Sequence, residues 1–381
     1  MADTLFNSFF IGGFEASTHV LRSGKRLDML EATGHTRHIR RDYQRLMDMG
    51  INTARTGIRW HLIEQRAGVY DWSSALPMIR SARETGMQLI WDLLHYGYPN
   101  DIDLFSTAFL RRFRKLARAF AHMLAQETDY APYICPVNEI SFFAWAGGDG
   151  AHMNPFANGR SFELKCQLVR AALEATDVMW EVFSDARICH VDPVLHIVPN
   201  PDRPYEIADA DGYRIAQYQG WDLLGGIFKP EIGGEARHLD VLGLNFYPNN
   251  EWVYKGDTLK RHDPRYKPFR EIIREVYSRY QRPMFIAETG AEGDQRVEWL
   301  RYMCSEVRAA IDEGLPVHGI CLYPIMNFPG WEDDRDCQNG LWEYPDANGN
   351  RQPYHPLAQE LIRQQAMFEP ILQVQNFSQF S

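Results

Sequence analysis

Two stretches of the chain place an acidic residue directly after a run of mostly apolar residues. The run 133–137 leads into Asn138 and Glu139, and the run 284–287 leads into Glu288. A single acidic residue in this position can cap a helix, pair with a cation or point into a site. Two of them aimed at one point form the pair of carboxylates that cleavage of a glycosidic bond requires.

That chemistry needs two carboxylates in different protonation states. One carboxylic acid protonates the leaving oxygen, while the other is ionised and attacks or stabilises the anomeric carbon. Their surroundings must therefore hold their pKa values apart. Arg55 lies in the strand predicted at 51–58 and Arg59 directly after it, and their even spacing from Thr53 predicts that both lie on one face. A guanidinium there either keeps one carboxylate ionised or forms a salt bridge at the rim.

An alternation of amphipathic helices and short apolar strands must position these residues. Gly50, Gly86 and Gly314 each end a helical stretch and precede an apolar one, where glycine supplies the left-handed residue that closes a helix. Strands are predicted at 8–14, 51–58, 87–94, 133–139, 187–192, 240–247, 284–288 and 317–323. Helices are predicted at 37–49, 72–85, 106–127, 161–183, 209–223, 269–281, 294–313 and 356–367.

This order predicts an α/β protein with a single (β/α)8 TIM barrel. A doubly wound open sheet is the alternative, but no glycine-rich phosphate fingerprint follows the first strand. The long stretches 15–36, 140–160, 193–206 and 248–268 all follow strands, so they should surround a site at the carboxyl ends of the strands. One catalytic domain is expected over 1–381, with a core of about 5–368 and a C-terminal tail at 369–381.

Composition restricts the partners. The chain has 381 residues and a net charge of −10, which disfavours nucleic acid and anionic membrane surfaces and leaves the oligomeric state open. Its 10 Trp, 18 Tyr and 21 Phe suit a carbohydrate site. The six cysteines form no CxxC pair and are expected to be buried thiols in a reducing compartment. The first 14 residues lack the features of a signal peptide, so a cytoplasmic location is expected.

Five short motifs occur in order along the predicted strands. They are Arg55 to Trp60, His95 to Pro99, Asn138-Glu139-Ile140, Asn245-Phe246-Tyr247 and Ala287-Glu288-Thr289-Gly290. Together they make the chain resemble the retaining glycoside hydrolases of clan A. The resemblance is greatest to the family 1 β-glycosidases, so the chain is β-glucosidase-like. The resemblance covers nearly the whole chain and fits a divergent member or a sister family.

The resemblance implies roles for individual residues. Glu139 would be the acid/base and Glu288 the nucleophile. Arg55 and Tyr247 would hydrogen-bond to the nucleophile, and Asn138 would hold the sugar 2-hydroxyl. Further substrate contacts are implied for His95, for Trp60 and Asn245 in the matched motifs, and for Tyr323, which stands where the family has a tryptophan floor.

Two family residues that bind the outer hydroxyls of the sugar lack a clear counterpart. Glu15 or His19 is expected to replace the glutamine after the first strand. The glutamate after the last strand gives way to Asn327-Phe328-Pro329-Gly330-Trp331, so Asn327 and Trp331 are candidates for its role. The identity of the sugar therefore cannot be carried over. The acidic loop at 332–336 disfavours a phosphorylated sugar.

The expected function is a retaining β-glycosidase acting by double displacement on a non-phosphorylated β-linked glycoside or oligosaccharide, without cofactor. An endo-β-glycanase, a transglycosidase and an inactive carbohydrate-binding barrel are the alternatives. A closed pocket would indicate exo action, and an aromatic-lined open cleft endo action. His35 and His38 lack a third ligand nearby and are expected as a surface pair, with no metal site.

Overall fold

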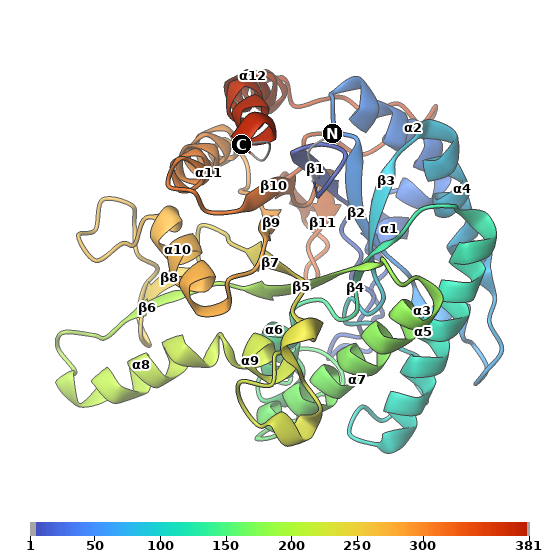
Figure 1. The fold of residues 1–381 in the computed structure, drawn as a ribbon, viewed down its shortest axis with the longest axis horizontal. Helices are drawn as coiled ribbons and strands as arrows, with labels where there is room; N and C mark the ends of the chain where they lie inside the picture. The colour runs from blue at the N-terminus through green and yellow to red at the C-terminus, as the bar shows by residue number, and fades with distance from the viewer. Residues whose placement is uncertain (1–4, 379–381) are drawn as a thin grey trace.

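The computed structural model describes residues 5–378, in which eight parallel strands close into a barrel (Figure 1). The barrel strands in chain order are β1 (Phe10–Gly13), β2 (Thr53–Gly57), β3 (Gln88–Asp92), β4 (Tyr133–Cys135), β5 (Arg187–Pro193), β7 (Val241–Asn245), β9 (Met284–Thr289) and β10 (Val317–Leu322). β1 pairs in parallel with both β2 and β10, which closes the ring. The predicted TIM barrel and its strand order are confirmed.

Helices alternate with these strands and cover the barrel. They are α2 (His35–Asp48), α4 (Leu76–Thr85), α5 (Thr107–Glu127), α7 (Ser161–Val182), α8 (Ile207–Ala216), α9 (Gln219–Leu224), α10 (Phe269–Tyr280), α11 (Gln295–Asp312) and α12 (His355–Ser378). Gly86 ends α4 with φ +78°, as its position in the sequence predicts.

The helix boundaries differ from the prediction at three places. The helix predicted at 72–85 starts as a 3-10 turn at 72–74, and the α-helix begins only at Leu76, with Pro77 in its first turn. The helix predicted at 209–223 is divided into α8 and α9. The helix predicted at 356–367 continues to Ser378, so most of the predicted tail is helical, and Phe368 stacks on Phe9 with ring centroids 4.4 Å apart.

Most of the remaining elements lie in connections that follow strands, whereas the 3-10 turns at 230–232 and 236–238 lie between α9 and β7. The remaining elements are α1 (Met29–Ala32), α3 (Trp60–Ile63), α6 (Ile140–Gly148), the pair β6 (His196–Val198) and β8 (Glu251–Val253), the pair β11 (Phe328–Pro329) and β12 (Asp336–Cys337), and 3-10 turns at 204–206, 230–232 and 236–238. In Figure 1, α8, β6 and β8 extend to the left of the barrel. Most of the irregular segments thus lie at the carboxyl ends of the strands.

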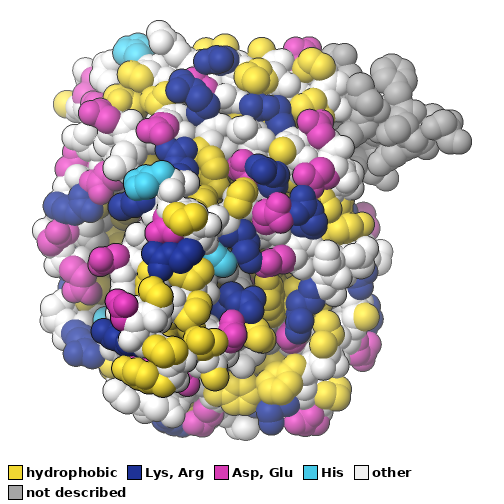
Figure 2. Space-filling view, turned by 90° about the vertical axis from the view of Figure 1, so that its left-hand side faces the viewer, with side chains coloured by type: hydrophobic (Ala, Val, Ile, Leu, Met, Phe, Trp, Pro, Cys, Tyr) yellow, Lys and Arg dark blue, Asp and Glu magenta, His cyan; other side chains and the backbone are white. Residues whose placement is uncertain are grey.

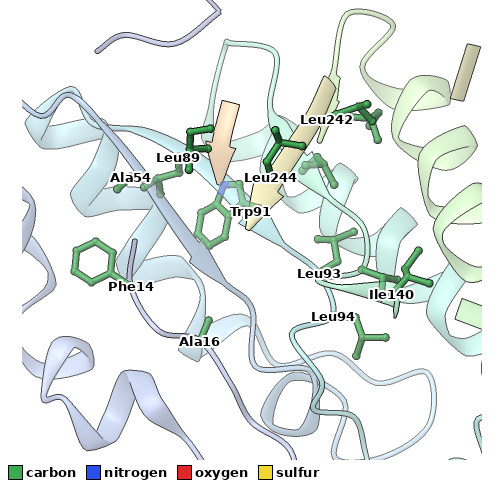
Figure 3. Packing of buried hydrophobic residues seen from close by; sticks show 14 of the residues in the cluster. Phe14, Ala16, Ala54, Leu89, Trp91, Leu93, Leu94, Ile140, Leu242 and Leu244 are labelled. Carbon is green, nitrogen blue, oxygen red and sulfur yellow. The ribbon is translucent and has the colours of Figure 1, made fainter. Parts of the chain in front are cut away.

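Alternation along the strands separates two packed layers. Trp91, Leu242 and Leu244 point outward into the layer between barrel and helices (Figure 3). Their neighbours Ile90 and Val241 point inward and pack in the barrel interior. Successive side chains of a strand point to opposite faces. A polar residue whose neighbours along the strand point outward therefore points into the barrel. This is how the strands aim polar groups at one point.

The outer surface has charges of both signs. On the face shown in Figure 2, basic and acidic side chains are interspersed, with apolar side chains between them. All six cysteines are buried and unpaired, as predicted. Between residues 5 and 378, no helix is both long and apolar enough to cross a membrane.

Phe113 of α5 tests the outer packed layer. It is fully buried among Trp60 and Phe109, so Phe113→Ala should lower the free energy of unfolding by about 3–5 kcal/mol. Arg111 on the same helix is exposed, and Arg111→Ala should change it by at most about 0.5 kcal/mol. Urea denaturation of both variants measures the difference, and equal effects would contradict the packing described here.

Candidate active site

A cavity of about 690 Å³ lies at the carboxyl ends of the barrel strands. Its catalytic half is lined by residues that follow the strands: Glu15, His95, Tyr96, Glu139, Tyr247, Glu288, Tyr323, Phe328, Trp331 and Asn339. Its outer half is lined by residues of helices α6 to α9 and of strand β8, among them Phe142, Trp145, Lys165, Tyr213, Gln219 and Trp252. The predicted site residues Glu15, His95, Glu139, Tyr247, Glu288, Tyr323 and Trp331 therefore share one cavity.

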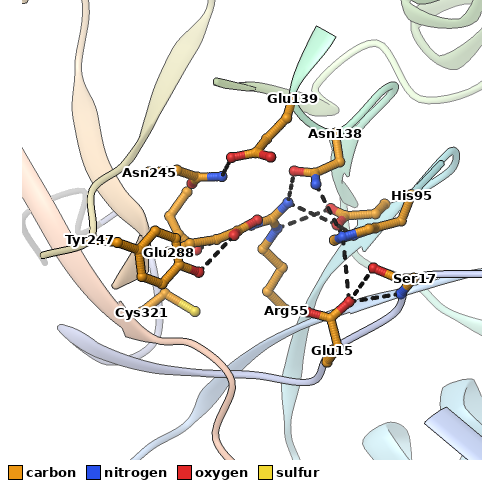
Figure 4. A network of polar contacts seen from close by, with 12 residues as sticks. Glu15, Ser17, Arg55, His95, Asn138, Glu139, Asn245, Tyr247, Glu288 and Cys321 are labelled. Carbon is orange, nitrogen blue, oxygen red and sulfur yellow. Dashed lines mark hydrogen bonds and ion pairs between the residues drawn. The ribbon is translucent and has the colours of Figure 1, made fainter. Parts of the chain in front are cut away.

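Arg55 lies fully buried beneath this cavity and connects its polar groups (Figure 4). Its guanidinium donates to both oxygens of Asp92, at 3.0 and 2.8 Å, and to Glu288 Oε1 at 2.8 Å. It also donates to Asn138 Oδ1 at 2.5 Å and to the carbonyl of Ala287 at 3.1 Å. These bonds use all five N–H donors of the guanidinium, which is what allows a buried cation to persist.

A register shift turns Glu288 toward Arg55. Phe285 and Ala287 of β9 point into the barrel, so simple alternation would turn Glu288 outward. The pairing of β7 with β9 changes register so that Asn245 lies opposite Glu288. Such an irregularity re-aims a side chain, and here it brings Glu288 inward, where the Tyr247 hydroxyl also donates to it at 2.9 Å.

Glu139 has a different set of partners. It caps α6 with a left-handed backbone, at φ +47°, a conformation that costs a non-glycine residue about 1–3 kcal/mol. Its carboxyl accepts hydrogen bonds from the Tyr96 hydroxyl and from Asn245 Nδ2, the latter at 2.8 Å. Both partners are neutral groups, and Glu139 has no ion pair with an arginine, lysine or histidine among residues 5–378.

These surroundings set the protonation of the two carboxyls. Burial, and then the negative charge of Glu288, raise the pKa of Glu139 to about 8, although the bonds from Tyr96 and Asn245 oppose this. Burial also raises the pKa of Glu288, but Arg55 and His95 stabilise its charged form. Since only Glu288 has a guanidinium partner, it ionises first, and Glu139 keeps its proton at neutral pH.

A hydrogen-bonded chain links the two carboxyls. Arg55 donates to both Glu288 and Asn138, and Asn138 Nδ2 donates to the Tyr96 hydroxyl at 3.0 Å. Tyr96 in turn donates to Glu139. Asn138 is thus fully buried with both ends of its amide bonded inside the protein, and its contact with a sugar hydroxyl stays a prediction.

His95 and Glu15 form the polar wall of the catalytic half. Nδ1 of His95 donates to Asp92 at 2.8 Å, and Nε2 lies 3.8 Å from Glu15 Oε1. Burial lowers the pKa of His95, but Asp92 and Glu15 outweigh it, so the pKa is raised. The same oxygen of Glu15 accepts bonds from the backbone and hydroxyl of Ser17.

Several polar atoms around this half have no hydrogen-bond partner within residues 5–378. They are both ring nitrogens of His19, Tyr323 Oη, Trp331 Nε1, Asn339 Oδ1 and Asn245 Oδ1. His19 lies behind the wall, edge-on to Trp331 with centroids 4.5 Å apart, and burial lowers its pKa to about 3. Buried polar atoms normally have partners, so the atoms of Tyr323, Trp331 and Asn339, which line the cavity, are available to ligand hydroxyls or water. His19 and Asn245 were predicted as substrate contacts, but they do not line the cavity.

Two predicted contacts are corrected. Trp60 lies in the core, packed against Phe109 and Phe113, and its indole N–H donates to Glu64 at 2.7 Å. Asn327 is buried away from the cavity, where its side-chain oxygen accepts from the Gly340 amide at 3.0 Å. Both side chains therefore stabilise structure around the site and do not line it.

Sequence reasoning missed Asp92, Tyr96 and Asn339. Asp92 ends the apolar strand β3, so the criterion that found Glu288 also applies to it. Tyr96 follows the predicted His95, and its positive φ of 67° turns it toward Glu139. Asn339 belongs to a segment after β12, and no local sequence pattern predicts the conformation of this segment. The aromatic residues of the outer half were likewise not expected.

Within residues 5–378, no three histidine, cysteine, aspartate or glutamate side chains are grouped so as to hold a metal ion. The expected surface pair of histidines is wrong in one respect. His35 is fully buried, stacked on Phe14 and bonded through Nδ1 to Asp42 at 2.9 Å.

Solved structures share this fold. The chain matches β-glucosidase from Thermotoga maritima in complex with glucoimidazole with a TM-score of 0.77 and 16% identity, covering 94% of this chain and 98% of that one. It matches the same enzyme's complex with deoxynojirimycin with a TM-score of 0.76, 16% identity, and coverage of 94% and 98%. A structure of the family 1 β-glucosidase with isofagomine lactam gives a TM-score of 0.76, 16% identity, and coverage of 96% and 99%.

These matches define the class of fold as the (β/α)8 barrel of the family 1 β-glucosidases, and they confirm the resemblance at that level. No protein-family model matches the sequence, and no curated protein matches it either. The low identity fits a divergent relative.

The protonation of Glu139 can be measured without any substrate. We expect a protonated carboxyl at pH 7 that titrates at about pH 8 in the infrared difference spectrum between wild type and Glu139→Gln. Tyr96→Phe should move this titration to higher pH, because the Tyr96 hydroxyl stabilises the charged form. Tyr205→Phe, on an exposed residue, is the control. A titration of Glu139 near pH 4.5 would contradict the assignment.

Proposed function

We propose that this protein is a retaining β-glycosidase that hydrolyses a non-phosphorylated β-linked glycoside or oligosaccharide. The observation that supports this best is the asymmetry of its two facing carboxyls: Glu288 pairs with Arg55, and Glu139 has only neutral donors. One ionised and one protonated carboxyl in a single cavity meet the requirements of glycosidic cleavage by double displacement. The shared fold of β-glucosidases crystallised with glucoimidazole and deoxynojirimycin agrees with a carbohydrate substrate.

In the first step, Glu288 attacks the anomeric carbon and forms a glycosyl ester. The bond to the leaving oxygen breaks, and Glu139 gives its proton to that oxygen. Arg55 and Tyr247 hold Glu288 in place through its two oxygens. In the second step, Glu139 takes a proton from water, which attacks the same carbon and releases Glu288 as a carboxylate. Two inversions give net retention.

The shape of the cavity favours exo action. The catalytic half is bounded by side chains that are nearly inaccessible to solvent, among them Glu15, His95 and Tyr323. The outer half reaches the surface, where Trp145 is 41% and Tyr213 42% exposed. A cavity of about 690 Å³ falls within the range that encloses a drug-sized ligand, so a terminal sugar and an aglycone fit together. An endo enzyme would need an exit at both ends.

Glu15 and Asn339 take the place of the family's missing hydroxyl-binding residues. All contacts of Glu15 within residues 5–378 use Oε1, which leaves Oε2 on the cavity wall without a protein partner. Asn339 lines the same cavity with a buried, unpartnered Oδ1. Both oxygens are acceptors, so they suit sugar hydroxyls and do not suit a phosphate.

A panel of aryl β-glycosides that differ in the sugar tests the proposal. One or more should be hydrolysed, and proton NMR of the early reaction should show the β-anomer as the first product. Release of the α-anomer first would show inversion and refute double displacement. Absence of hydrolysis across aryl glycosides and disaccharides alike would refute the activity itself.

Variants of the two carboxyls test their roles. Glu288→Ala should abolish turnover, because no glycosyl ester can form. Glu139→Ala should lower kcat by about 10²–10⁴-fold on a poor leaving group and far less on an activated one, since only the former needs a proton. Azide should accelerate the Glu139 variant and give the β-glycosyl azide. If instead the Glu288 variant gives the β-glycosyl azide and the Glu139 variant gives the α-glycosyl azide, the two roles are exchanged.

Selectivity among hydroxyl groups tests Glu15. Glu15→Gln keeps the size of the side chain but weakens an acceptor, so kcat/KM for the preferred sugar should fall about tenfold, the cost of a weakened buried hydrogen bond. The loss should vanish for the one deoxy analogue that lacks the contacted hydroxyl. A uniform loss across the 3-, 4- and 6-deoxy sugars would assign Glu15 to the support of Ser17 and His95 instead.

A further inference from the structure

Lys165 is the only lysine or arginine among the described residues that line the cavity. It lies near the start of α7 with 7% of its surface exposed. Its ammonium group donates to Gln219 Oε1 at 3.1 Å, and no carboxylate within residues 5–378 comes within 4.0 Å of it. An ammonium group has three N–H donors, so two remain available on the cavity side.

The surroundings of Lys165 do not supply a full counter-charge. Asp192 is the acidic group that acts on it, but Asp192 is itself held by the backbone and hydroxyl of Ser141, at 2.9 and 2.7 Å. Burial raises the pKa of Asp192 to about 7, so much of its charge is absent at neutral pH. Asp149, also on the cavity wall, accepts from the Ser161 amide at 3.1 Å.

Burial lowers the pKa of Lys165, and Asp192 opposes this. A buried cation without a paired anion is costly, and an anionic ligand would remove that cost. The aromatic rings of Trp145, Tyr213 and Trp252 line the same outer half and can pack against the apolar body of such a ligand.

We propose that the outer half binds an aglycone with a planar apolar body and a single carboxylate, and that Lys165 forms the ion pair with this carboxylate. The assignment of this ligand as an aglycone rests on the proposed function, while its charge is inferred from Lys165 and its planar apolar body from the aromatic rings. A carboxylate fits better than a phosphate, because one cation faces the ligand and Asp149 would repel a second negative charge.

Matched substrates isolate the charge. The 4-carboxyphenyl and 4-carbamoylphenyl β-glycosides of the hydrolysed sugar have nearly the same shape and differ in charge. The ratio of their kcat/KM values should fall about tenfold in Lys165→Met, which is the effect of losing one charge-assisted bond. Lys165→Arg should retain most of the ratio, and Lys115→Met, on an exposed residue of α5, should leave it unchanged. The same ratio in wild type and Lys165→Met would overturn the proposal.

Binding gives a test that needs neither turnover nor a variant. In calorimetry with the wild-type protein, 4-hydroxybenzoate should bind about tenfold more tightly than 4-hydroxybenzamide. Equal affinities would overturn the role of Lys165 even if glycosides are hydrolysed. Selective binding of the benzoate in a protein that hydrolyses no glycoside would instead refute the glycosidase proposal and leave the carboxylate site standing.

Discussion

The buried guanidinium of Arg55 is the interaction on which the rest of the site depends. Removing a cation from water is tolerable only if all of its donors find acceptors and its charge is compensated. Arg55 meets both conditions through Asp92, Glu288, Asn138 and a backbone carbonyl. These acceptors come from strands β3 and β9 and from the segment after β4, so one side chain fixes the relative position of three parts of the barrel.

The asymmetry of the two carboxyls follows from this one placement. Glu288 shares the guanidinium with Asp92, and the charge it carries makes ionisation of its neighbour harder. Glu139 is reached only through the neutral links Asn138 and Tyr96. Hydrogen bonds from neutral groups orient a carboxyl but offset its burial incompletely. The same network therefore favours the ionised form of Glu288 and the protonated form of Glu139.

Much of the fold and the centre of the site could be predicted from the sequence, because both follow from short-range rules. Glycines after helices and apolar runs give the barrel, and acidic residues at strand ends give Glu139 and Glu288. The errors arise where three-dimensional context decides. Trp60 shares a motif with Arg55, but it starts α3 and its indole packs between helices. Asn327 is close in sequence to Trp331, yet a turn around Gly340 uses its side chain.

The residues that line the outer half of the cavity could not be predicted from the sequence, and the physical reason also bears on function. These residues come from α6, α7, α8, α9 and β8, of which α6 and β8 are additions to the eightfold pattern, and none of these elements is a barrel strand with a register imposed by its neighbours. The residues at the strand ends must supply hydrogen-bond partners to Arg55 and to two carboxyls at once, so few substitutions would be tolerated there. The outer elements have no such common constraint, and Lys165 or the aromatic rings can be exchanged without disturbing the catalytic half. In the proposed function, the chemistry of the reaction and the choice of leaving group are thus assigned to separate parts of one cavity.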